Sequence, residues 1–178
     1  MTTNLPLTIL TAVVTLGAID VVYFHLYRFR LWAQPGSVAE EVTHLIRHVV
    51  FLAVLALLAS GVQTAVADRA VLVLIVIDLL NSAADVLLER RSREPLGGLP
   101  ATEYLIHVLS SFGLGIAVMA YLFARPQLPL PRPEGLLAWQ VGAMLVAGGV
   151  LFCVEAALFA SALLKRRATF WPRLAASA

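Results

Sequence analysis

The sequence predicts an all-α integral membrane protein with five transmembrane helices, because of its composition, its apolar runs and the placement of its basic residues. Of its 178 residues, 60% are hydrophobic and 13% are charged, and the mean hydropathy is +0.87. Soluble domains are about half apolar and about a quarter charged. So few charged side chains cannot cover a water-soluble globule of this size. The single cysteine excludes an internal disulfide bond and a metal site built from several thiolates.

Five apolar runs are each long enough to cross the hydrocarbon core of a bilayer, which takes about 20 helical residues. They cover approximately residues 5–27, 43–66, 71–88, 104–123 and 136–164. The short connection at residues 67–70 predicts a tight hairpin. The connection at residues 125–134 is rich in proline, which predicts an extended spacer. We therefore expect residues 1–178 to form a single transmembrane domain in contact with the lipid bilayer.

The basic residues predict the orientation of this domain. Nine Lys and Arg residues fall in the segments on one side and three fall on the other, while Arg47 lies inside the second run. Short cytoplasmic loops carry the excess of Lys and Arg, so the N-terminus is expected outside and the C-terminus in the cytoplasm. The first run has neither a basic segment before it nor a small-residue cleavage site. We expect it to be retained as a helix and not removed as a signal peptide.

An internal repeat with an offset of 63 residues relates two parts of the chain. Its copies are Arg28-x-Arg30, nine residues, Glu40-x-x-x-His44, and Arg91-x-Arg93, nine residues, Glu103-x-x-x-His107. They predict two parallel hairpins, residues 5–66 and 71–123, related by a pseudo-two-fold axis along the membrane normal. The first four helices should form a four-helix bundle, to which helix 136–164 is an addition. The paired arginines are interpreted as topology signals, with contact to a lipid phosphate as the alternative.

Ionisable side chains gather in the cytoplasmic half of the first four runs. In the second, third and fourth helices, an advance of 100° per residue places them together on one face. The sets are Asp20, Tyr23 and His25; Glu40, Glu41, His44 and His48; Asp78, Asn81, Asp85 and Glu89; and Glu103 and His107. An ionisable group in hydrocarbon costs at least about 2.5 kcal/mol. We therefore expect these side chains to face one another inside the bundle.

These side chains predict a site for two metal ions. Taken alone, each has a simpler explanation, a hydrogen bond to a neighbouring helix. Together their acids outnumber the bases, and bound cations would balance the excess charge. Mixed carboxylate and imidazole ligands favour iron, with zinc or manganese as alternatives. We expect Asp20, Tyr23, Arg47 and Asn81 to orient the ligands. The expected ligands are His25, Glu40, Glu41, His44, His48, Asp78, Asp85, Glu89, Glu103 and His107.

Two resemblances follow from these motifs. The ligand set is similar to that of carboxylate-bridged di-iron four-helix bundles, although those use Glu-x-x-His, a spacing met here only by Glu41-x-x-His44. A longer signature resembles a group of uncharacterised bacterial polytopic membrane proteins over the first four runs. It comprises Asp20-x-x-Tyr23-x-His25-x-x-Arg28-x-Arg30-Leu31, Glu40-x-x-x-His44, Asp85-x-x-x-Glu89-Arg90 and Glu103-x-x-x-His107. This resemblance implies a bacterial inner-membrane protein and no particular substrate.

The sequence leaves three classes of function open. The first is a membrane oxidoreductase of the oxidase, hydroxylase or desaturase type, acting on a hydrophobic small molecule or lipid that enters laterally. The same ligands holding zinc and a water would instead give a hydrolase. The second is a b-type haem protein with His44 and His107 as axial ligands. The third is a proton- or metal-coupled transporter. No nucleic-acid-binding motif is present, so nucleic acid is not an expected partner.

The fifth run carries two further features. Glu155 lies deep within it and is expected to be protonated or turned toward the bundle. Small residues between Gly142 and Gly149 form a helix-packing surface, which could support a homodimer.

Overall fold

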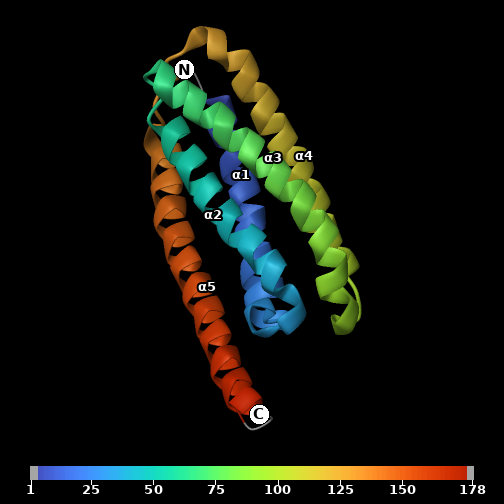
Figure 1. The fold of residues 1–178 in the computed structure, drawn as a ribbon. Helices are drawn as coiled ribbons and strands as arrows, with labels where there is room; N and C mark the ends of the chain where they lie inside the picture. The colour runs from blue at the N-terminus through green and yellow to red at the C-terminus, as the bar shows by residue number, and fades with distance from the viewer. Residues whose placement is uncertain (1–3, 176–178) are drawn as a thin grey trace.

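The computed structural model describes residues 4–175, with side chains described through Arg166. Over these residues the chain is helical, with five long helices and no strand (Figure 1). They are α1 (Leu5–Asp20), α2 (Val38–Ala59), α3 (Ala65–Arg93), α4 (Ala101–Ala124) and α5 (Gly135–Ala175). Helix α1 continues directly into a π-helical segment, Val21–Arg28. The prediction of five helices long and apolar enough to cross a membrane is confirmed.

Helices α1 and α2 form the middle of the fold. Helix α4 packs along α1, α3 packs along α2, and α5 packs against α2 and α1. Helices α3 and α4 make little direct contact with each other. In Figure 1, α5 therefore lies at one edge of the molecule and α4 at the other. The helix that is an addition to the repeat is packed directly onto the two central helices.

The connection between α2 and α3 lies earlier in the chain than predicted. Residues 67–70, expected as the hairpin turn, form the first turn of α3, and the chain reverses at residues 60–64. Gly61, with φ of +83°, adopts the left-handed conformation that glycine accepts at no steric cost. Thr64 then caps α3, since its hydroxyl accepts a hydrogen bond from the Ala67 N–H at 3.1 Å. A helix that starts with a cap can include polar residues that interrupt an apolar run.

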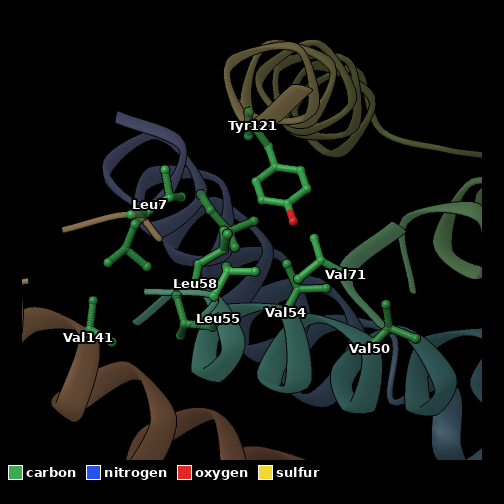
Figure 2. Close-up of a cluster of buried hydrophobic side chains, with 12 residues drawn as sticks. Leu7, Val50, Val54, Leu55, Leu58, Val71, Tyr121 and Val141 are labelled. Atoms are coloured by element: carbon green, nitrogen blue, oxygen red, sulfur yellow. The ribbon is translucent and has the colours of Figure 1, made fainter. Parts of the chain in front are cut away.

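An apolar cluster fills the half of the bundle next to this turn. Figure 2 shows its buried side chains, among them Leu7 of α1, Val54 of α2, Val71 of α3 and Tyr121 of α4. The proline-rich segment closes this end, because the Leu130 N–H donates to the Gly61 carbonyl at 2.7 Å. The ionisable side chains are thus left to the opposite half, where the first helix becomes π-helical and where α2 begins.

Helix α5 approaches α2 closely at Gly148. A Cβ atom at this position would lie 2.9 Å from Leu52 Cδ2, so a larger residue would require the Leu52 side chain to shift. A Cβ atom added to Gly142 or Gly149 would meet no atom within 4 Å. Part of the small-residue surface of α5 is therefore used within the chain.

Candidate metal centre

The winding of the first helix brings Asp20 and His25 together. Residues Val21–Arg28 are π-helical, and the Phe29 N–H bonds the Phe24 carbonyl five residues earlier. Residues five apart then share a side of the helix, whereas α-helical winding would turn them about 140° apart. Asp20 Oδ2 lies 3.3 Å from His25 Nε2, and both residues are buried.

The same winding turns Tyr23 away from the centre. Tyr23 is 48% exposed, and its ring packs edge-on against Phe24. A residue three positions after Asp20 shares its face in an α-helix but not in a π-helix. The structure thus places Tyr23 on a different side of the helix from Asp20 and His25, the residues beside which it was expected to act.

One group of possible metal ligands consists of Asp20, His25, Glu103 and His107. One ligand atom from each lies within 4.8 Å of the others. His107 Nε2 is 3.0 Å from Asp20 Oδ2, and His107 Nδ1 is 3.0 Å from Glu89 Oε1. His25 Nε2 is 3.5 Å from Glu103 Oε1. We call this the Asp20 group; it draws on the first helix and α4, with Glu89 of α3 holding the far side of His107.

A second group consists of His25, His44 and Glu155, whose ligand atoms also lie within 4.8 Å of one another. The His44 ring stacks on the His25 ring with 4.2 Å between centroids. Glu155 reaches this group from α5 and is fully buried, and its Oε2 is 3.6 Å from His48 Nδ1. We call this the His44 group. The two groups share His25.

Glu155 is a candidate ligand that the sequence did not assign. The expectation that it turns toward the bundle is met by its burial. A signal was available in the spacing, because Glu155 lies seven residues, or two helical turns, after Gly148 on the face of α5 that approaches α2. Helix α5 lies outside the repeat, whose two copies contain most of the predicted ligands.

Asp85 connects α3 to α2 beside the His44 group. Its Oδ1 accepts a hydrogen bond from the Thr43 hydroxyl at 2.7 Å and lies 3.2 Å from His44 Nε2. Its Oδ2 accepts one from Arg47 at 3.3 Å, so Arg47 contacts one of the expected ligands. Asp78 lies 3.5 Å from Arg47 Nε. Of the acids expected as ligands on α3, Asp78 and Asp85 therefore share Arg47, and only Asp85 of these two also contacts a histidine.

Arg93 is buried in the centre, not exposed in a loop as a topology signal would be. Helix α3 continues past its predicted end at residue 88, and Arg93 is 1% exposed there. Its guanidinium lies 2.8 Å from Glu40 Oε1, donates a hydrogen bond to Glu103, and is 3.3 Å from His25 Nε2. Because it contacts both glutamates of the repeat, it balances part of their charge.

Three other predicted residues lie outside both groups. Glu40 is held by Arg93 and by a hydrogen bond from Ser92. Glu41 is buried, and neither of its carboxylate oxygens has a hydrogen-bond partner in the described part of the protein. Asn81 donates to the Thr43 carbonyl at 2.9 Å, so it joins α3 to α2 and contacts none of the ligands.

The centre contains more acids than bases. Arg47 and Arg93 stand against eight carboxylates: Asp20, Glu40, Glu41, Asp78, Asp85, Glu89, Glu103 and Glu155. Buried polar atoms normally have partners. Yet the described residues offer no hydrogen bond to His25 Nδ1, His44 Nδ1, Asp20 Oδ1 or Glu103 Oε2. An adjoining cavity of about 150 Å³ is lined by several of these side chains. The excess of carboxylates over arginines, the nitrogen and oxygen atoms without partners and the open space together fit bound cations.

Comparison with known proteins does not assign the chain to a family. No protein family matches the chain, and neither a curated protein nor a solved structure is detectably similar to it. The candidate centre therefore rests on the positions of its own side chains.

Proposed function

We propose that the chain is a multi-pass membrane protein that binds two metal ions, iron in the first place, and acts as an oxidase, hydroxylase or desaturase on a lipid-soluble substrate. The observation that carries this proposal is the convergence of three histidines, His25, His44 and His107, with buried carboxylates from all five helices. Two ligand groups sharing one histidine suit two neighbouring ions. Carboxylate and imidazole donors suit iron or manganese.

Insertion into a membrane is supported by the surface of the helices. Large apolar side chains are exposed on several of them, such as Leu79 (68%), Phe112 (70%) and Val146 (70%). Soluble proteins rarely leave so much contiguous apolar surface in contact with water. The nine-to-three distribution of basic residues supports a cytoplasmic C-terminus, and with it a metal centre in the cytoplasmic half of the bilayer. A bacterial inner membrane fits the signature in the sequence.

The pseudo-two-fold relation between the hairpins is supported by matching contacts. Such an axis would exchange the pair α1 and α4 with the pair α3 and α2, and both pairs pack along their length. It would also exchange His107–Asp20 with His44–Asp85, two contacts of 3.0 and 3.2 Å. Asp20 stands two positions before the residue that the offset would pair with Asp85. The π-helical segment follows directly after Asp20, and it is absent from α3.

In the oxidase, hydroxylase and desaturase reactions alike, the protein side chains would hold and orient the ligands of the ions. Bound ions would pass electrons to dioxygen, the oxidant in all three reactions. In an oxidase the substrate supplies these electrons, whereas a hydroxylase or desaturase takes two from the substrate and two from an external reductant. Glu89 orients His107 through Nδ1, which leaves Nε2 for an ion beside Asp20. Asp85 orients His44 through Nε2, which leaves Nδ1 for an ion. Arg93 pairs with Glu40 and Glu103 and balances part of their charge, and bound ions would balance the rest.

The alternative functions have less support. In a b-type haem protein the rings of His44 and His107 would face each other across an open slot. Instead, the His25 ring stacks on His44 and lies 6.5 Å from His107 at 87°. A transporter needs a polar path through the membrane, and the half of the bundle next to the α2–α3 turn is filled by an apolar cluster.

Metal analysis and an absorption spectrum of the protein purified in lipid nanodiscs test this proposal. We expect about two iron or manganese ions per chain and no Soret band. A Soret band would establish the haem protein, and zinc alone would establish the hydrolase. Protein that is folded but binds neither metal nor haem, even after incubation with Fe²⁺ or Mn²⁺, would exclude the proposal.

A further inference from the structure

A second cavity lies between α3 and α4, beyond the metal centre. It measures about 240 Å³ and is lined by side chains of α1, α2, α3 and α4 that are almost all apolar, such as Val54, Ile75 and Leu114. We call it the apolar chamber. Its few polar lining groups are Asp78, Ser82, Ser111 and Tyr121. The first three stand toward the metal centre, whereas the Tyr121 hydroxyl at the far end already donates to Asp68 at 2.7 Å.

The apolar chamber adjoins the cavity beside the metal centre. Phe51, Ser82, Ser111 and Leu114 line both cavities. His25, His44 and His107 line the one beside the centre and none of them lines the apolar chamber. A ligand in the mainly apolar chamber would therefore lie next to the cavity that the histidines line.

The apolar chamber opens sideways, between two helices that are joined only near their ends. At one end Arg125 of α4 donates to Asp68 of α3 at 2.8 Å, and at the other His107 of α4 lies 3.0 Å from Glu89 of α3. Between these contacts α3 and α4 scarcely touch. Gly115 of α4 lines the chamber in this stretch, is exposed, and would meet no atom within 4 Å if it carried a Cβ. In a membrane this opening faces the lipid chains.

The length of the apolar chamber matches one lipid chain. It extends along α4 from Ser111 to Tyr121, ten residues, or about 15 Å. The hydrocarbon core of a bilayer is about 30 Å thick, so each leaflet contributes acyl chains that span about half of it. The apolar lining disfavours polar ligands. The polar groups Asp78, Ser82 and Ser111 lie at the end of the chamber that faces the metal centre.

We infer that the apolar chamber binds one acyl chain of a membrane lipid, which enters between α3 and α4 and extends from the metal centre toward Tyr121. This inference rests on the proposed function for its reaction, since the bound chain would be the substrate. The chamber itself needs no metal, so chain binding and metal binding can be tested separately.

The test is photo-crosslinking in nanodiscs of phosphatidylglycerol that carries a diazirine at the end of one acyl chain, followed by mapping of the labelled residues. Gly115→Trp places a large ring in the opening, and Gly142→Trp is the matched control. Gly142 is an exposed glycine of α5 with equally open space, and it lines neither of the two cavities. Gly115→Leu gives a smaller obstruction if the larger variant does not fold. Labelling of exposed Phe123 serves as the internal reference for bulk lipid.

We expect label on chamber residues near the middle of the bilayer, such as Ile75 and Leu114, in the wild type and in Gly142→Trp. Relative to Phe123, this label should fall about tenfold or more in Gly115→Trp, because the ring fills the space the chain would occupy. Chamber label that is absent from the wild type, or unchanged in both Gly115 variants, would overturn the inference. The metal content of the same samples separates the two proposals. Full metal content without chamber label would contradict only the binding of an acyl chain. Chamber label without metal would contradict only the metal centre.

Discussion

The Arg93 guanidinium lies 2.8 Å from the Glu40 carboxylate, although the two residues belong to different copies of the repeat. Arg93 also donates to Glu103, the glutamate of its own copy. The equivalent arginine of the first copy, Arg30, is exposed. One arginine thus serves the glutamates of both copies, and the repeat is asymmetric at this point.

Replacing Arg93 should destabilise the fold. Arg93→Leu leaves Glu40 and Glu103 buried without their cation, and removing one partner of a buried ion pair costs about 3–5 kcal/mol. Arg91→Leu is the control, because Arg91 belongs to the same motif and is exposed. Thermal unfolding in detergent, followed by circular dichroism, should show a clearly lower Tm for Arg93→Leu alone. Equal Tm values for the two variants would contradict the role assigned to Arg93.

The orientation of the chain can be tested with single cysteines in a Cys153→Ala background. Gln127→Cys and Arg91→Cys place exposed thiols at opposite ends of the bundle. With the N-terminus outside, a membrane-impermeant maleimide should modify Gln127→Cys in intact cells and Arg91→Cys only after permeabilisation. The reverse pattern would place the metal centre in the other half of the bilayer.

The five helices could be predicted because hydropathy over about 20 residues depends little on detail. Helix ends could not, since the charged residues Glu89 to Arg93 lower the hydropathy of α3 while its backbone continues as a helix. Because α3 continues through these residues, Arg93 is buried in the bundle and does not lie in a loop. A sequence contains the α-helical period but no comparable mark of π-helical winding, so the outward position of Tyr23 could not be predicted.

The site was predictable as a set of residues and less so as a set of contacts. Shared faces on α2, α3 and α4 placed His44, Asp85 and His107 inside the bundle, where the structure has them in contact with carboxylates or histidine. Which acid meets which base depends on the packing of one helix on another. Glu155 shows this most clearly, because its place beside His48 follows from the close approach of α5 at Gly148.

Glu155→Gln should weaken metal binding in the His44 group. The substitution keeps the shape of the side chain and removes the charge that a cation would neutralise, and an altered ligand environment typically costs about 10- to 100-fold in affinity. Cys153→Ala, an exposed neighbour on α5, should bind as the wild type does. Titration with Mn²⁺ against a competing chelator measures the difference. If the affinities of both variants match the wild type, Glu155 is not a ligand.

Asp85→Asn should also reduce metal affinity, through His44. Asp85 lies 3.2 Å from His44 Nε2, and loss of its charge removes the group that orients this ring. Asp78→Asn is the matched comparison, because the ion pair of Asp78 is with Arg47 and not with a histidine. We expect about a 10- to 100-fold loss for Asp85→Asn and a smaller change for Asp78→Asn in the same chelator competition. An equal loss in both variants would point to helix packing as the common cause.

The metal content of His25→Ala, compared with Tyr23→Ala, tests the central claim most directly. His25 belongs to both ligand groups, whereas Tyr23, two residues earlier on the same π-helical segment, points away from them. In protein purified in nanodiscs and matched for folding by circular dichroism, Tyr23→Ala should retain about two ions per chain and His25→Ala should retain fewer than one. Full metal content in a folded His25→Ala variant would contradict the shared-histidine centre.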